Sequence, residues 1–254
     1  MSQILIKGKP EFSKAIPKEP YLDVAEFFSD TIQGEGINIG RPATFLRLQG
    51  CIGNCHWCDT REVWRYGNPY TITELLDLME DHGVVEKLQK GQHLVITGGS
   101  PLMQQDALIQ FLKTLYFRFE FTPYMYIEIE NECMIMPNEE LYNYIDCWNN
   151  SPKLSNSGNA TSLQYQPKIL REVASLRNTW FKFVVAGEHD WQEIKENYLD
   201  TLLISRDQII LMPLGADRGE LFKNSYKVVN IAIRENVLYS SREHITLWNL
   251  AIGV

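Results

Sequence analysis

Three cysteines stand close together in the first quarter of the chain. Cys51, Cys55 and Cys58 form a Cys-x3-Cys-x2-Cys array directly after the apolar, strand-like run 44–49. A cubane [4Fe-4S] cluster usually takes four thiolates, so three closely spaced cysteines leave one iron with a free coordination position. The array therefore predicts a cluster in which one iron can hold a further ligand.

Two other uses of cysteine fit this array less well. Disulfide frameworks are typical of small secreted domains, whereas this chain has 254 residues and only five cysteines, two of them isolated. A structural zinc ion takes four ligands, and the sequence has no second Cys-x2-Cys and no His-x3-His pair. His56 would have to be the fourth ligand from inside the same short loop. An iron-sulfur site is therefore favoured over zinc.

The cysteine spacing resembles that of the radical S-adenosylmethionine (SAM) superfamily. The resemblance implies that the amino and carboxylate groups of SAM chelate the free iron. Trp57, immediately before the third cysteine, matches the aromatic residue that the superfamily often places near the adenine. This resemblance predicts the cofactors, a 4Fe-4S cluster and SAM, but says nothing about the substrate.

Composition limits the other classes of function. A content of 44% hydrophobic residues is enough for a core, and residues 21–254 are predicted to form one domain after an extended arm, residues 1–20. The formal net charge of −8 argues against sequence-independent binding of nucleic acid. No apolar run approaches the length of a membrane span, so no membrane partner and a cytoplasmic location are expected. A small-molecule substrate is the better prediction.

Strand-like and helix-like runs alternate along the chain, which predicts parallel strands joined by crossover helices. Strands are predicted at 44–49, 93–97, 125–130, 180–185 and 208–212, and helices at 73–82, 104–116, 138–145, 166–176 and 191–198. Functional residues of parallel α/β folds gather at the carboxyl ends of the strands. The cysteine loop and the segments 98–100, 130–132 and 151–153 are all expected at that rim.

A second motif, Ser29-Asp30-Thr31-Ile32-Gln33-Gly34-Glu35-Gly36, precedes the cysteines. Alone it would be read as a hairpin turn, because glycine permits positive φ. Followed by Phe45-Leu46-Arg47-Leu48-Gln49-Gly50-Cys51 and Cys58-Asp59-Thr60, it resembles the 7-carboxy-7-deazaguanine synthase family. Later segments extend the resemblance over most of the chain: 96–102, 151–154, 182–184, 211–215 and 241–248.

The resemblance implies both a fold and a reaction. The fold would be α/β, a partial (β/α)6-type TIM barrel with an N-terminal extension. Reductive cleavage of SAM would give a 5′-deoxyadenosyl radical that converts 6-carboxy-5,6,7,8-tetrahydropterin to 7-carboxy-7-deazaguanine and ammonia, a step in queuosine-type 7-deazapurine biosynthesis. Mg²⁺, an external electron donor of the flavodoxin or ferredoxin type, and a homodimer are also implied.

The same resemblance assigns residues to the substrate and the magnesium ion. Gln33, Gly34 and Glu35 match the substrate-contacting segment, and His244 lies in a segment implied to close over the substrate, with the carboxylate of Val254 possible beside it. Arg47 could hold the substrate carboxylate in a bidentate pair, or be a surface arginine. Thr60 matches the magnesium-binding hydroxyl, with Asp59 as the alternative ligand.

The SAM site is implied to include Trp57, Gly98, Gly99, Ser100, Glu130, Ser151 and Lys153. At position 100 the family has a glutamate for the α-ammonium of SAM, and this chain has serine. Where the family usually has Glu-Thr-Asn-Gly, the chain reads Glu130-Asn131-Glu132-Cys133. We expect Glu128, Glu130 or Glu132 to compensate for Ser100.

Two other functions remain open from the sequence. A radical SAM activase that makes a glycyl radical on a partner protein uses the same cysteine spacing, although the Gln-Gly-Glu-Gly segment and the carboxy-terminal histidine count against it. A non-catalytic iron-sulfur or zinc-binding regulator could have kept the fold while losing turnover through Ser100.

Overall fold

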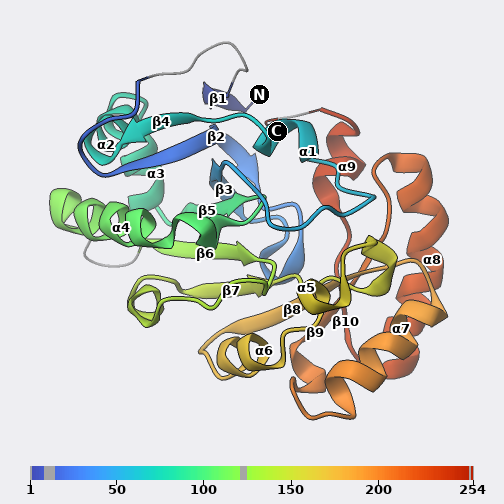
Figure 1. The fold of residues 1–254 in the computed structure, drawn as a ribbon. Helices are drawn as coiled ribbons and strands as arrows, with labels where there is room; N and C mark the ends of the chain where they lie inside the picture. Colours follow the sequence, from blue (N-terminus) through green and yellow to red (C-terminus); the bar gives the residue numbers. More distant parts are fainter. Residues whose placement is uncertain (1, 9–14, 121–124, 252, 254) are drawn as a thin grey trace.

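A mostly parallel sheet forms the centre of the molecule (Figure 1). The structure is a computed structural model that describes residues 2–8, 15–120, 125–251 and 253. Strands pair in the order β1-β2-β3-β5-β6-β7-β8-β9-β10, and β4 also pairs with β2. From β3 to β10, neighbouring strands of the sheet are parallel to one another. This unidirectional order is that of a barrel rather than of a doubly wound sheet.

The parallel strands are short, and except in β10 nearly all of their residues are buried, as expected when helices cover a sheet. They are β3 (Pro42–Leu48), β5 (His93–Gly98), β6 (Tyr126–Asn131), β7 (Cys147–Asn150), β8 (Thr179–Val185), β9 (Ile209–Pro213) and β10 (Leu238–Tyr239). The predicted strands correspond to β3, β5, β6, β8 and β9. Neither β7 nor β10 was predicted.

Helices lie around the outside of the curved sheet (Figure 1). They are α1 (Arg61–Trp64), α2 (Ile72–Asp81), α3 (Val84–Gln89), α4 (Gln105–Phe119), α5 (Thr161–Gln164), α6 (Pro167–Ala174), α7 (Glu188–Ile194), α8 (Arg218–Glu235) and α9 (Glu243–Trp248). Thr71 begins α2 with a capping box: its hydroxyl accepts from the Glu74 amide at 3.1 Å, and Glu74 accepts from the Thr71 amide at 2.8 Å.

Two predicted helices differ in kind. Residues 138–145 contain only a 3-10 turn, Glu139–Asn143. The helix predicted from residue 191 already begins at Glu188 and changes to a π-helical turn, Lys195–Leu199. Residues of a π turn still place apolar side chains inward, so the sequence pattern does not reveal the change.

The N-terminal side of the sheet is antiparallel. β2 (Tyr21–Ile32) pairs with β3, with β4 (Asn68–Thr71) and with β1 (Gln3–Lys7). The predicted arm thus contains a strand, and its Ile6 is buried in the core. The loop between β2 and β3 carries the Gln33–Gly36 motif and reaches β8 and β9, so it crosses the mouth of the partial barrel.

The core has two large parts that follow the two halves of the sheet. One packs β2–β7 against α2 and α4, and the other packs β8 and β9 against α6, α7 and α8. In the part of the chain that the structure describes, no helix is both long enough and apolar enough to cross a membrane. These observations confirm the predicted fold class, a partial α/β barrel.

Candidate active site

One cavity of about 300 Å³ lies at the carboxyl ends of the parallel strands. Its lining comes from the loops after β2, β3, β5, β6 and β7, together with Lys182 on β8 and the C-terminal segment. Every site residue predicted from the sequence that the structure describes lines this cavity, except Ser100 and Glu128, which are both fully buried. Val254 lies outside the described residues. The fold therefore gathers segments from Gln33 to His244 around one space.

The three thiols of the cysteine array share this cavity, and each sulfur has a polar neighbour. Ser100 Oγ donates to Cys51 Sγ at 3.6 Å, Asn159 Nδ2 to Cys55 Sγ at 3.1 Å, and Trp64 Nε1 to Cys58 Sγ at 3.5 Å. Hydrogen bonds to sulfur are the usual surroundings of cluster thiolates and tune the cluster they hold. The donor set fits an iron-sulfur cluster.

The spread of the thiols distinguishes a cluster from a single ion. Thiolates around one tetrahedral zinc lie about 3.8 Å apart, from a Zn–S bond of about 2.3 Å. Among the described His, Cys, Asp and Glu residues, the only three whose ligand atoms all lie within 4.8 Å of one another are His189, Asp190 and Glu193. The three thiols are therefore spread more widely than one zinc ion requires.

Residues 155–159, a serine- and asparagine-rich segment, hold the cysteine loop in place. The His56 amide donates to Ser157 O at 2.9 Å, and Trp57 Nε1 donates to Asn156 O at 3.1 Å. The Asn54 amide donates to Asn159 Oδ1 at 2.7 Å. This function of the segment was missed from the sequence, because nothing in a polar run indicates which distant loop it contacts.

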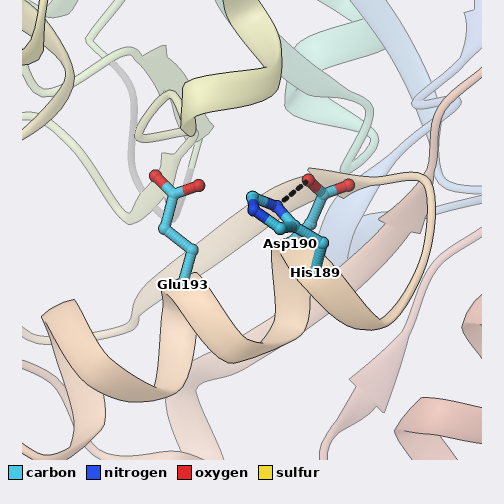
Figure 2. A group of neighbouring side chains, drawn as sticks. All are labelled: His189, Asp190 and Glu193. Carbon is cyan, nitrogen blue, oxygen red and sulfur yellow. Dashed lines mark ion pairs between the residues drawn. The ribbon is translucent and has the colours of Figure 1, made fainter.

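His189, Asp190 and Glu193 form a separate cluster at the start of α7 (Figure 2). Both carboxylates already have structural partners. Asp190 Oδ2 accepts from the Ala186 amide at 2.6 Å, and Glu193 accepts from the amide and the hydroxyl of Ser155, at 2.9 Å and 2.5 Å. Glu193 thereby anchors the segment that holds the cysteine loop, and the cluster belongs to the scaffold.

Three acids follow one another at alternate positions at the end of β6. Glu128 accepts from Gln33, Asn38 and Asn149, and burial raises its pKa to about 7. Glu130 accepts from Thr97 at 2.9 Å. Glu132 lines the same cavity as Cys51. Cys133 has a φ of 61°, a conformation suited to the glycine that the family run has at this position.

Glu35 is the centre of a buried charge network. Lys182 Nζ donates to Glu35 Oε2 at 2.5 Å, Arg242 Nε donates to Oε1 at 2.9 Å, and Arg242 also pairs with Asp59. Burial favours the neutral carboxyl, but these two cations outweigh it and hold the pKa of Glu35 well below its usual range. Likewise, Glu130 and Glu35 raise the pKa of Lys182 against the effect of burial.

The roles of Lys182 and Arg242 in this network were missed from the sequence, although both residues stand in segments that carry the resemblance. A lysine within an apolar strand was the available signal, because a buried lysine requires a carboxylate partner.

His244 packs against the Gln-Gly-Glu-Gly loop. A Cβ on Gly34 would lie 2.3 Å from His244 Nδ1, so glycine is required for this approach. The Glu243 amide donates to Gly34 O at 2.8 Å, and His244 Nε2 lies 3.8 Å from Glu35 Oε1. Burial lowers the pKa of His244, which favours the neutral imidazole near pH 7. The C-terminal segment thus closes over one side of the cavity.

The remaining predicted residues fall at distinct places on the wall. Arg47 is mostly buried and its Nε lies 3.3 Å from Glu26 Oε2, so it is not a surface arginine. Thr60 precedes α1, but its side chain makes no capping hydrogen bond. Its hydroxyl lies 3.8 Å from Cys58 Sγ. Lys153 Nζ donates to the carbonyl and hydroxyl of Ser151, at 2.8 Å and 2.9 Å.

Gly99 is packed against the start of the cysteine loop. A Cβ there would lie 2.3 Å from both Cys51 Cβ and Gly50 O. From the sequence, Gly99 was expected in the SAM site. In the structure, the space that its missing side chain leaves is taken by the loop that carries the cysteines.

Together, the unidirectional parallel sheet and a three-thiol cluster site at its carboxyl edge define an iron-sulfur enzyme of the radical SAM class. Residues 32–168 match the family model described as a 4Fe-4S single cluster domain. The crystal structure of QueE from Escherichia coli has a similar fold, with a TM-score of 0.65, 22% identity, and coverage of 88% of this chain and 95% of that one.

Curated relatives identify the family. The 7-carboxy-7-deazaguanine synthase of Pyrobaculum aerophilum is 32% identical over 236 residues, which cover 92% of this chain and 98% of the relative. That of Hyperthermus butylicus is 29% identical, with 88% and 92% covered. The chain belongs to the 7-carboxy-7-deazaguanine synthase family.

Proposed function

We propose that this protein forms 7-carboxy-7-deazaguanine and ammonia from 6-carboxy-5,6,7,8-tetrahydropterin. The observation that carries the proposal is that the three thiols share one cavity with Gln33, Glu35, Arg47 and His244. With a 4Fe-4S cluster and SAM bound, the site would supply one-electron reductive cleavage and radical hydrogen abstraction. The family relationship supports this reaction over the glycyl-radical activase and the regulator.

The polar residues of the cavity suit a carboxylated pterin. The Arg47 guanidinium can form a bidentate pair with the substrate carboxylate, in competition with Glu26. The carboxylate of Glu35 and the amide of Gln33 suit the donor-rich pyrimidine edge of the pterin. Because Lys182 and Arg242 hold Glu35 in its ionised form, it would accept hydrogen bonds rather than donate them. Neutral His244 would close the site beside it.

The SAM side of the cavity would be formed by Trp57, Gly98, Gly99, Glu130, Ser151 and Lys153, with Ser100 behind it. Trp57 is held by Asn156, so its ring is positioned in advance for the adenine. The Ser151 hydroxyl and the Lys153 ammonium, which contact each other, offer polar groups to the amino-acid end of SAM.

Mg²⁺ would bind at Thr60 beside the substrate carboxylate, with Asp59 as a second oxygen ligand. Hydroxyl and carboxylate oxygens are suitable ligands for this hard cation, which keeps several waters. Both residues line the cavity, and Arg242 already holds one oxygen of Asp59. An external one-electron donor of the flavodoxin or ferredoxin type, a homodimer and a cytoplasmic location complete the proposal.

The test is an anaerobic activity assay on reconstituted protein. With the carboxypterin, SAM, Mg²⁺ and dithionite, the wild-type protein should form 7-carboxy-7-deazaguanine, detected by mass spectrometry. Cys55→Ala should abolish the product. Cys147→Ala should retain it, because Cys147 lies in β7 with its side chain buried outside the cavity.

The two rival functions give different results in the same assay. Cleavage of SAM only after addition of a partner protein would indicate the activase. A loaded cluster with neither product nor SAM cleavage would indicate the regulator. Either result would contradict the proposed synthase.

A further inference from the structure

Glu132 is a buried carboxylate without a partner at the edge of the cluster site. It follows β6 directly, lines the cavity and is only 6% exposed. Within the described part of the chain, neither Oε1 nor Oε2 has a hydrogen-bond partner. An ionised carboxylate buried in this way is costly unless a cation or donor satisfies it. The site therefore lacks one positively charged donor.

The other two acids of this run are already satisfied. Glu128 accepts hydrogen bonds from three amide side chains, those of Gln33, Asn38 and Asn149. Glu130 accepts from Thr97 and lies 3.6 Å from Lys182 Nζ. Of the three acids that the sequence offered as compensation for Ser100, only Glu132 has both oxygens free for a ligand.

The groups nearest to Glu132 are engaged elsewhere. The Ser100 hydroxyl donates to Cys51 Sγ and accepts from the Ile52 amide at 3.1 Å, so it is part of the cysteine loop's support. Lys153 Nζ donates to Ser151. Burial raises the pKa of Glu132, and the nearby Ser100 hydroxyl, the Glu132 amide and the Lys153 charge oppose this in part. None of these groups meets the geometry of a hydrogen bond to either carboxylate oxygen.

We propose that Glu132 accepts hydrogen bonds from the α-ammonium of SAM, a role that rests on the proposed function. The ammonium carries one positive charge and three donors, which is what the two free oxygens lack. Glu132 and Cys51 line the same cavity, so the carboxylate borders the space that the cluster ligands share. In this chain the carboxylate stands after β6 at position 132 instead of after β5 at position 100.

Affinity for SAM tests this role without turnover. The Glu132→Gln variant keeps the shape of the side chain and removes its charge. On anaerobically reconstituted protein, equilibrium dialysis should show SAM binding weakened about tenfold or more, as expected for a lost charge-assisted hydrogen bond. Binding of 5′-methylthioadenosine, which lacks the amino-acid part, should be unchanged.

Glu62→Gln is the matched control, because it removes the same charge from an exposed position on α1, close to the cysteine loop in sequence. It should bind both compounds as the wild type does. A Glu132→Gln variant that binds SAM like the wild type, that weakens both compounds equally, or that fails to retain its iron would overturn the proposal. Wild-type protein with a loaded cluster but no affinity for SAM would overturn the proposed function as well.

Moving the carboxylate from position 132 to position 100 provides a second test. Glu132→Asn alone should lose affinity for SAM as Glu132→Gln does. Adding Ser100→Glu returns the carboxylate to the neighbouring loop and should restore most of the lost affinity. A double variant that folds and holds its cluster but stays as weak as Glu132→Asn would contradict the exchange of roles. The isosteric Glu132→Gln result stands independently of whether the double variant folds.

Discussion

At the scale of single residues, the site depends on buried side chains whose opposite charges compensate one another. Lys182 is 3% exposed on β8, and its ammonium contacts the carboxylate of Glu35 from a loop about 150 residues earlier in the chain. Removing one partner of a buried pair leaves the other charge without compensation, which costs about 3–5 kcal/mol. The same charges hold Glu35 in its ionised form.

Lys182→Met should therefore destabilise the fold by about 3–5 kcal/mol near pH 7, measured by urea denaturation. The low pKa of Glu35 in the folded state contributes stability above the unfolded value of 4.5, and this contribution is lost as the pH falls. The difference between wild type and variant should accordingly shrink below about pH 4.5. Arg118→Met, which breaks exposed pairs with Asp77 and Glu80, should cost less than about 1 kcal/mol. Equal losses in the two variants would contradict this account.

At the scale of elements, the cysteine loop owes its shape to the segment 155–159. Gly158 has a φ of 73°, and a Cβ there would lie 2.2 Å from His56 Cε1, in the middle of the cysteine array. A side chain at this position must displace the His56 ring, beside the hydrogen bond from the His56 amide to Ser157 O. The segment therefore contacts the cysteine loop through packing as well as through hydrogen bonds.

Gly158→Ala should reduce the iron retained after anaerobic reconstitution, measured by iron content and the visible absorption of the cluster. Gly91→Ala is the matched control, because Gly91 has a φ of 92° but nothing within 4 Å of its Cβ position. Alanine at positive φ strains the backbone in both variants, but only in Gly158→Ala does the added Cβ clash with the cysteine loop. Similar iron contents in the two proteins would show that the contact is unimportant.

At the scale of the whole molecule, the C-terminal segment covers a cavity built by the rest of the barrel. His244, Ile245, Asn249 and Leu250 line that cavity, while the strands of the sheet end before residue 240. Arg242, just before α9, ties the segment to Glu35 and Asp59. The C-terminal segment is thus attached by the ion pairs of Arg242, and the residues after Arg242 form one side of the cavity.

Deleting residues 243–254 should leave the sheet folded but expose the cluster. We expect the cluster of the shortened protein to bleach in air several times faster than that of the full chain, with little change in far-ultraviolet circular dichroism. Leu247→Ser, which changes an exposed residue of α9 outside the cavity, should bleach at the wild-type rate. Unchanged bleaching of the shortened protein would mean that the segment does not shield the site.

Much of this arrangement could be predicted because local patterns carry it. The apolar runs 93–97 and 180–185 predicted β5 and β8, because a parallel strand covered on both faces reads as continuous hydrophobicity. The long helix α8 was missed: only Leu221, Val228, Ile231 and Ala232 of its 18 residues are buried, so its apolar stripe is narrow. The cysteine spacing predicted the ligands, but not Asn159, Trp64 and Ser100, which surround them.

The sequence by itself determined the chemistry available to this protein, because ligand type, ligand spacing and strand hydrophobicity are properties of short segments. It also offered three acids at 128, 130 and 132 as equals. Only the tertiary structure separated them, by giving Glu128 and Glu130 hydrogen-bond partners from other segments and leaving Glu132 without any. Hydrogen-bond partners are decided by which segments the fold brings together, and that information is not contained in any one segment.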